Sequence, residues 1–291
     1  MSKTIGNPLT WVTQRLGDSS QFMGESGRAL GSVDRDPIVI RQLVARDVTD
    51  ALRKGAQDFM SLRTDVIAIV LMYPIIGIML VWFALDRTLL PLVFPIVAGF
   101  ALIGPVAAIG LYEMSRLLER RENVSWADAL RVMGSPSFAP IATLGAYLAA
   151  VYIVWLIVAV TIYNVTIGPE APSSIGALLQ TVLTTSAGWT LLIVGVGVGL
   201  VSAVVVLAIS VVSFPLLLDR PVGLSVAVVT SVKVARQNPG VVALWGIAVV
   251  ALLGIGILTF FIGLIVTLPI LGHATWHLYR KAIAEHSSPL A

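Results

Sequence analysis

The chain alternates between long apolar stretches and short charged ones. Residues 239–281 contain no acid, and His273 is their first ionisable side chain. At a rise of about 1.5 Å per residue, this stretch is too long for one crossing of a bilayer and long enough for two. We therefore expect a helical hairpin there, with its turn at residues 259–263. The same length criterion predicts six spanning helices, at residues 65–85, 89–112, 141–163, 189–218, 240–258 and 262–279.

An amphipathic helix is predicted immediately before the first span. Val48, Ala51 and Leu52 recur with helical spacing, so that they form one apolar face. Asp47 stands where an acid can cap the first turn. We expect this helix to lie on the membrane surface.

Two further segments repeat this arrangement before later spans. In residues 125–133, Ser125 and Asp128 occupy the positions of a capping box. Residues 225–237 form the third segment, with Ser225 as the expected cap. The predicted apolar stripe of the second segment consists of Trp126, Ala129, Leu130 and Met133.

The spans also show signs of internal repetition. A glycine, a proline six residues later and an arginine eleven residues after that occur in both the second and the last predicted span. The sequence Asp-Ala-Leu-Arg occurs at 50–53 and again at 128–131. We therefore predict an all-α fold of six spanning helices in three repeats, each a cytoplasmic amphipathic helix followed by a helical hairpin. The matched residues are Gly99, Pro105 and Arg116, and Gly263, Pro269 and Arg280.

Composition places the chain among polytopic membrane proteins. Hydrophobic side chains make up 57% of it and charged ones only 12%, against about a quarter in soluble domains. The chain has no cysteine, which excludes disulfides and thiolate metal sites. Residues 47–283 are expected to form the membrane domain. The polar residues 1–46 are expected to be disordered or loosely bound to the surface, and residues 284–291 to form a cytoplasmic tail. The first apolar run begins after Asp65, so we expect no cleavable signal peptide.

Lys and Arg are distributed unequally between the two sides of this topology. Nine precede the first span, four lie between the second and third, three between the fourth and fifth, and two follow the last. Arg87 is the remaining base and falls on the other side. Because positively charged flanks stay in the cytoplasm, we expect both termini to be cytoplasmic.

Six motifs are spread over most of residues 48–281. They are DALRKGAQDF (50–59), FPIVAGFALIGPVAAIGLYEMSR (94–116), VSWADAL (124–130), SFPLLLDR (213–220), NPGVVALWG (238–246) and GHATWHLYRK (272–281). With these motifs the chain resembles a bacterial family of predicted integral membrane proteins catalogued as a domain of unknown function. Leu62 stands where that family is expected to carry proline. The resemblance implies an inner-membrane setting and a six-helix fold, and it supplies no established activity.

The predicted spans carry almost no ionisable side chains between their ends. A charge at the bilayer centre costs about 2.5–3.5 kcal/mol and survives mainly where it carries ions or protons. Ion-coupled transport by buried carboxylates is therefore disfavoured. We also see no cluster of nucleophile, base and orienting acid, and the bases are dispersed along the chain. An enzyme, a cofactor and a nucleic-acid partner are therefore not expected.

Ionisable residues gather at the predicted cytoplasmic ends of the even-numbered spans. His277 occupies the repeat position of Glu113, and Asp219 ends the fourth span. If the repeats close into a ring, these side chains can converge on a polar binding vestibule. The alternative is a set of helix ends wetted by solvent. The candidate residues are Glu113, Arg116, Asp219, His277 and Arg280.

Two histidines, His273 and His277, lie one helical turn apart in the last predicted span. Imidazoles at that spacing can share a metal, but zinc takes three or four ligands. A haem held between helices would need a further histidine, and the remaining one is His286 in the tail. Packing and hydrogen bonding at the interface are the alternative. In the same motif, Trp276 and Tyr279 are expected at the lipid headgroups.

Small residues line one face of the fourth predicted span. Gly195 and Gly199 are four residues apart and are followed by Ser202, a spacing that lets another helix approach closely. We expect that helix to belong to the same bundle rather than to a second copy. Kinks are expected at the prolines of the even-numbered spans, Pro105, Pro215 and Pro269.

Two classes of function fit these features. The first is a noncatalytic protein of the bacterial inner membrane that binds another membrane component or supports its assembly into a complex. The second is a passive carrier or channel for a lipid or a small neutral solute. A continuous polar cavity reaching both faces would favour the carrier, and a closed bundle with an exposed apolar groove would favour binding. The expected partners are the bilayer and another membrane protein or complex.

Overall fold

The computed structural model describes residues 38–84, 89–120 and 124–284, and its named elements in these ranges are all helices. The predicted all-α class is therefore confirmed for the described residues. Most of the polar amino-terminal segment, Arg87 and His286 lie outside them. The helices are α2 (Ala45–Val70), α3 (Met72–Ala84), η1 (Leu90–Leu92), α4 (Val93–Ala107), α5 (Ile109–Glu119), η2 (Trp126–Gly134), α6 (Phe138–Thr166), α7 (Ile175–Thr184), α8 (Ser186–Ser210), α9 (Ser213–Asp219), α10 (Leu224–Gln237), α11 (Pro239–Leu258) and α12 (Leu264–Ala282).

Three helices in the described ranges are long and apolar enough to cross a membrane. They are α6, the pair α8–α9 taken together, and α11, with mean hydropathies of 2.2, 2.9 and 2.7. Large apolar side chains such as Ile157, Ile193 and Ile247 are exposed on their outer surfaces. In water this surface would be costly, whereas lipid tails cover it. The chain is therefore a membrane protein, and the six-span count remains a prediction.

Two of the predicted spans are broken four residues before a proline. The first is divided between α2 and α3 after Val70, and Pro74 follows four residues later. The fourth is divided between α8 and α9 at Val211, and Pro215 follows at the same distance. A proline ring clashes with the carbonyl four residues earlier and cannot donate to it, which accounts for both breaks. The second span is divided between α4 and α5 at Ala108.

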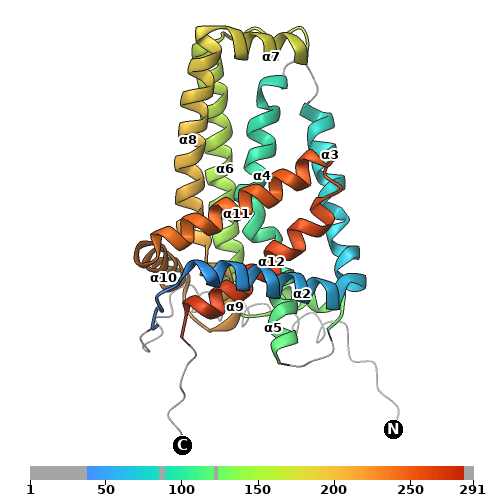
Figure 1. Ribbon diagram of the computed structural model, residues 1–291, viewed down its shortest axis with the longest axis vertical. Helices are drawn as coiled ribbons and strands as arrows, with labels where there is room; N and C mark the ends of the chain where they lie inside the picture. Colours follow the sequence, from blue (N-terminus) through green and yellow to red (C-terminus); the bar gives the residue numbers. More distant parts are fainter. Residues whose placement is uncertain (1–37, 85–88, 121–123, 285–291) are drawn as a thin grey trace, which may run out of the picture.

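The predicted carboxyl-terminal hairpin is formed by α11 and α12, and its turn lies at residues 259–263 as expected. Figure 1 shows both helices running obliquely across the molecule, while α6 and α8 stand upright and side by side. The turn lies beside α3, short of the level of α7. Within it, Phe260 and Phe261 have φ angles of 56° and 65°, a left-handed conformation that bulky residues rarely adopt. The Phe261 ring packs directly on Gly77 of α3, where a Cβ atom would lie 2.4 Å from it.

The helix α12 lies inside the bundle. Trp276 and Tyr279 are each only 1% exposed, so the expectation that they reach the lipid headgroups is wrong. That expectation treated α12 as a lipid-facing helix, whereas α2 packs along its length. At Gly55 of α2 the two backbones approach so closely that a Cβ atom would lie 2.6 Å from the Ala274 nitrogen. A glycine is needed there because any side chain would separate the helices.

The three predicted amphipathic segments are helical, with two local corrections. The second, η2, is a 3₁₀-helix rather than an α-helix. Asp128 caps it as expected, because its carboxylate accepts a 2.8 Å hydrogen bond from the Ser125 backbone nitrogen. In the third, α10, Gly223 rather than Ser225 is the cap residue. The predicted stripe of η2 is divided between buried Ala129 and exposed Trp126, Leu130 and Met133.

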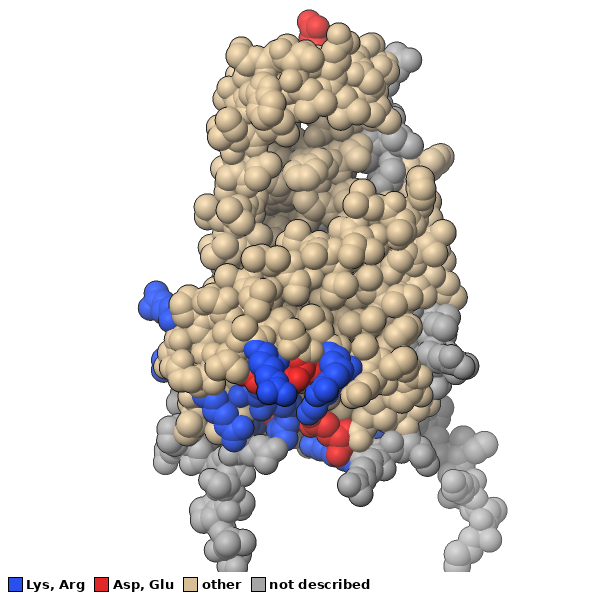
Figure 2. All heavy atoms as spheres, viewed as in Figure 1, with Lys and Arg blue, Asp and Glu red and all other residues tan. Residues whose placement is uncertain are grey.

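Charged side chains gather at one end of the molecule, which we call the foot. Figure 2 shows Lys, Arg, Asp and Glu there, below a surface that is otherwise almost free of charge. The foot is formed by α2, α5, α9, α10 and the carboxyl end of α12, and α7 lies across the opposite end of the upright helices (Figure 1). Glu170 follows α6 near α7, far from this group.

Candidate functional site

Four helices bring polar and ionisable side chains together inside the foot. The helix α12 supplies His273 and His277, which share one face because they are four residues apart. The helices α2, α5 and α9 supply the acids that face α12. We call this group the foot network. It consists of Asp58, Ser115, Glu119, Asp219, His273, His277, Tyr279 and Arg280.

Asp58 is the centre of one half of the network. Its Oδ2 atom accepts hydrogen bonds from the Ser115 hydroxyl at 2.7 Å and from His277 Nε2 at 2.8 Å. The Ser115 oxygen also lies 2.8 Å from His273 Nδ1. Because the single hydroxyl proton is given to the carboxylate, His273 Nδ1 must be the donor to the serine oxygen. The network thus sets the orientation of both imidazole rings.

The position of Asp58 affects its ionisation. Burial raises the pKa of Asp58, but the hydrogen bonds from His277 and Ser115 lower it by more, so that it lies below its ordinary value of 3.8. Asp58 is therefore ionised at neutral pH. An ionised carboxylate with two donors is a stable anchor for α12.

The other half of the network is centred on Arg280. Its Nε atom lies 3.2 Å from Glu119 Oε2, and its Nη1 atom lies 3.7 Å from Asp219 Oδ2. Tyr279 donates a 2.6 Å hydrogen bond to the same Asp219 oxygen. Glu119 joins the two halves, because its Oε1 atom is 3.9 Å from His277 Nδ1.

Three of the five predicted vestibule residues therefore belong to one network, namely Asp219, His277 and Arg280. The other two, Glu113 and Arg116, form a bidentate pair on α5 with contacts of 2.6 and 2.7 Å. Glu113 is only 3% exposed. The binding vestibule stays a prediction. In the structure, the side chains of the foot network contact one another across α2, α5, α9 and α12.

Sequence reasoning missed Asp58, Ser115 and Glu119. A signal for Asp58 was present, because it follows Asp47 by eleven residues and so lies on nearly the same face of the amphipathic helix. When an apolar helix face is buried in the folded protein, an acid at its edge needs a hydrogen-bond or ion-pair partner. The residues of α5 gave no such signal.

A second link joins α2 to the end of α12. Lys281 donates to Asp47 at 2.7 Å and lies 3.3 Å from Asp50. The hydrogen bond to Asp47 is the main reason that the pKa of Lys281 is raised above 10.5. Burial raises the pKa of Asp47, but Lys281 and the Val44 backbone lower it further, below 3.8.

The two histidines were also candidates for metal ligands. Among the described residues, no three side chains of the types His, Cys, Asp and Glu are grouped so that they could hold a metal ion. His277 contacts Asp58, and His273 contacts Ser115. The ring nitrogen His273 Nε2 is buried and has no hydrogen-bond partner in the described part of the chain.

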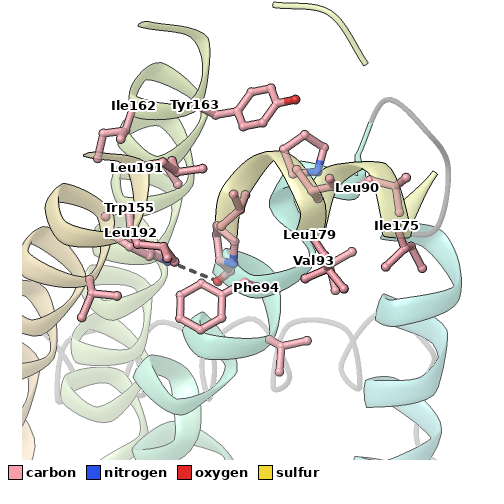
Figure 3. Close-up of a pocket in the computed structure, with 18 of the residues that line it drawn as sticks. Leu90, Val93, Phe94, Trp155, Ile162, Tyr163, Ile175, Leu179, Leu191 and Leu192 are labelled. Carbon is pink, nitrogen blue, oxygen red and sulfur yellow. Dashed lines mark hydrogen bonds between the residues drawn. The ribbon is translucent and has the colours of Figure 1, made fainter. Parts of the chain in front are cut away.

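A large apolar cavity lies in the other half of the molecule, between α7 and the α11–α12 turn. Its volume is about 560 Å³, within the range of small-molecule sites. Figure 2 shows the hollow below the helix that crosses the end of the molecule, and Figure 3 shows the side chains around it. Its walls are Leu90, Pro91, Val93, Phe94, Pro95, Val97, Trp155, Ala159, Ile162, Tyr163, Ile175, Leu178, Leu179, Val182, Leu191, Leu192, Gly195, Val196, Ile257 and Phe261.

The two polar side-chain groups in this wall are already hydrogen-bonded. Trp155 Nε1 donates to the Pro95 carbonyl at 3.2 Å, the contact drawn in Figure 3. The Tyr163 hydroxyl donates to the Glu170 carbonyl at 3.2 Å. The cavity therefore presents hydrocarbon to whatever occupies it, and a polar occupant would lose its hydrogen bonds to water.

The small residues of α8 are divided between packing and this cavity. Gly199 faces Trp155 of α6, because a Cβ atom there would lie 3.0 Å from the indole ring. Gly195 does not pack against a helix and lines the cavity instead. Ser202 donates to Val198 in its own helix. Close approach of a helix is thus seen at one of the three predicted positions.

Comparison with known proteins agrees that the chain is a membrane protein. No curated protein and no solved structure matches the chain. A family model described as "Predicted integral membrane protein (DUF2189)" matches residues 93–219, from the start of α4 to the end of α9. This region contains two of the six motifs singled out above and all but the last residue of a third. Over these residues the chain matches the family that its motifs indicate, a family of predicted integral membrane proteins of unknown function.

Proposed function

We propose that the protein is a noncatalytic membrane protein that binds the hydrocarbon chain of another membrane component in the cavity beneath α7. The observation that carries the proposal is the chemistry of the wall, since aliphatic and aromatic side chains line about 560 Å³. Lipid chains are the hydrocarbon that surrounds such a wall in a membrane. Binding would replace solvent or loosely packed lipid with close van der Waals contact.

The separation of the cavity from the foot network favours binding over passage. A carrier for a polar solute needs polar groups along its path, and those of the foot are paired with one another around Asp58 and Arg280. A carrier for lipid remains the alternative, and it would use the same cavity with exchange between leaflets. The paired state of the foot side chains is also our reason for proposing that the protein is not an enzyme.

The proposal includes six membrane segments in three units, with both termini in the cytoplasm of a bacterial cell. Three observations support this arrangement. The amphipathic helices α2 and α10 lie toward the charged foot (Figure 1), and η2 packs against α5 and α2, which form the foot. The charges themselves gather there (Figure 2). The bases in the loops obey the positive-inside rule with the foot on the cytoplasmic side.

Binding can be tested by filling the cavity from α8. Gly195 lines the cavity and has open space around its Cβ position, so Gly195→Leu would project a side chain into it. Gly197→Leu is the matched control, because Gly197 is two residues away, equally open and outside the lining. The full chain would be purified from native membrane in mild detergent, and bound lipid would be measured by native mass spectrometry.

We expect wild type and Gly197→Leu to retain lipid after delipidating washes, and Gly195→Leu to lose most of it. Equal retention by the two variants would overturn the assignment of the cavity. Absence of retained lipid on the wild type would overturn the binding function itself. Faster exchange of a labelled lipid between leaflets of vesicles containing the protein would favour the carrier.

A further inference from the structure

Residues 45–58 of α2 carry their acids and their bases on opposite sides of the helix. The three acids of this segment face the molecule: Asp47 and Asp50 contact Lys281, and Asp58 contacts His277 and Ser115. These carboxylates are between 17% and 26% exposed. Lys281 balances part of their negative charge, and all three carboxylates are directed away from the outer surface.

The bases of the same helix face outward. Arg46, Arg53 and Lys54 are exposed, with 69% of the Arg53 side chain accessible. Arg46 and Arg53 are seven residues apart and so lie on one face, which also carries exposed Gln57. Arg53 contacts Asp50 at 3.3 Å, but solvent screens a pair this exposed, so that it cancels little of the outward charge. The outer face of α2 is therefore basic.

The position of α2 in the molecule indicates which kind of partner its basic face can contact. Figure 1 shows the helix crossing the foot on its outer side, below the oblique α11–α12 hairpin, and Figure 2 shows basic side chains on that side of the foot. Exposed Val44 and Met60, at 60% and 64%, lie near the ends of the basic segment. A helix with bases flanked by apolar side chains, next to membrane-crossing helices, has the properties of an interfacial helix.

We propose that the outer face of α2 binds the headgroups of anionic phospholipids. Phosphate oxygens accept hydrogen bonds from guanidinium and ammonium groups, and the two arginines offer planar donor pairs that match them. The site is independent of the apolar cavity, which lies in the other half of the molecule. It explains why α2 directs its acids inward, since acids on the outer face would repel the headgroups.

The test compares lipid selection by charge variants of the full chain. Wild type, R46Q/R53Q/K54Q and R46K/R53K/K54R would be reconstituted into nanodiscs of phosphatidylethanolamine and phosphatidylglycerol in equal amounts. Mild detergent extraction would be followed by native mass spectrometry of the lipids that remain bound. Thermal unfolding followed by tryptophan fluorescence would show that each variant is folded.

We expect wild type and the charge-preserving variant to retain phosphatidylglycerol in preference to phosphatidylethanolamine. The glutamine variant should lose about fivefold in this preference for each base that binds a headgroup. An unchanged lipid ratio in the glutamine variant would overturn the proposal. So would a loss of equal size in the charge-preserving variant, because the effect would then not depend on charge. Retention of nucleic acid or of a soluble protein in place of lipid would also overturn it.

Discussion

Asp58 and His277 are 219 residues apart in the sequence and are joined by a 2.8 Å hydrogen bond. The contact fastens the first described helix to the last, at the point where the DALRKGAQDF and GHATWHLYRK motifs meet. Gly55 and Ala274 bring the two backbones together one turn away. The chain therefore closes on itself at the foot, and α12 is held inside the bundle rather than at its lipid-facing surface.

Removing the central carboxylate should destabilise the fold. We expect Asp58→Asn to reduce the free energy of unfolding by about 1.5–3 kcal/mol, because hydrogen bonds to a charged and mostly buried acceptor are lost. Thermal unfolding in detergent, followed by the fluorescence of the seven tryptophans, would measure the change. Asp50→Asn is the matched control on the same helix. Its carboxylate is 26% exposed and shares Lys281 with Asp47, so we expect a loss below about 1 kcal/mol. Equal losses in the two variants would contradict a central role for Asp58.

The Asp47–Lys281 pair predicts a dependence of stability on pH at both extremes. The pKa of Asp47 is lowered below 3.8 in the folded protein, so its contribution is present above that value and is lost as the pH falls through the lowered pKa. The pKa of Lys281 is raised above 10.5, so its contribution is complete below 10.5 and is lost as the pH rises through the raised pKa. The contribution of this pair to stability should therefore be level around neutral pH.

The variant Lys281→Met isolates this effect from other titrating groups. We expect the difference in melting temperature between wild type and Lys281→Met to be constant near neutral pH. The difference should shrink as the pH rises from 10.5 through the raised pKa of Lys281 and as it falls from 3.8 through the lowered pKa of Asp47. A difference that stays the same from pH 3 to pH 11 would show that the pair does not contribute through its charges.

The elements that the sequence predicted best are those governed by local rules. The turn at residues 259–263 and the Asp128 cap of η2 follow from apolar length and from helix-end chemistry, and both are present. Trp276 and Tyr279 were misplaced because their environment depends on α2, which lies more than two hundred residues earlier. A belt of aromatic residues is predicted for a helix that faces lipid, and periodicity within α12 does not reveal that another helix covers it.

The foot network shows the same division between local and long-range information. His277, Arg280 and Asp219 could be proposed because they end helices that the repeat aligns. Ser115 could not, because a lone serine inside a helix is ordinarily satisfied by its own backbone. Its role depends on two partners from α2 and α12, which only the packing brings within 2.8 Å.

Phe261 should limit the size of the apolar cavity. It lines the cavity and packs on Gly77, while neighbouring Phe260 has the same left-handed backbone and is 84% exposed. Phe261→Ala should therefore enlarge the space and shift the retained lipids toward longer or bulkier chains, and Phe260→Ala should not. Gly77→Ala should also change the shape of the cavity, because the added methyl group would displace the Phe261 ring. Native mass spectrometry would compare the lipids bound by wild type and by the three variants. Identical lipid-chain profiles for wild type and Phe261→Ala would show that Phe261 does not limit the size of the cavity.

The membrane topology can be read directly, because the chain has no cysteine and each introduced thiol is unique. Ser173 lies in the segment between α6 and α7, and Lys54 lies on α2 at the foot, both exposed. With an impermeant maleimide on intact cells, we expect Ser173→Cys to be labelled and Lys54→Cys to be labelled only after the cells are permeabilised. Met133→Cys on η2 should behave as Lys54→Cys does, because both helices lie at the foot. Labelling of Met133→Cys from outside would overturn the proposed arrangement of the first two units.

Cysteine labelling can also test whether the hairpin of α11 and α12 crosses the whole bilayer. Its turn carries Phe260 and Ile262, which are 84% and 64% exposed, and Figure 1 shows it short of the level of α7. Apolar side chains this exposed need lipid around them, so the turn should stay within the hydrocarbon. We therefore expect Ile262→Cys to resist the impermeant reagent from both sides and to react with a membrane-permeant maleimide. Labelling from outside would mean that α11 and α12 each cross the full bilayer. In either case the hairpin returns to the side on which it began, so the carboxyl end of α12 lies on the side of the foot.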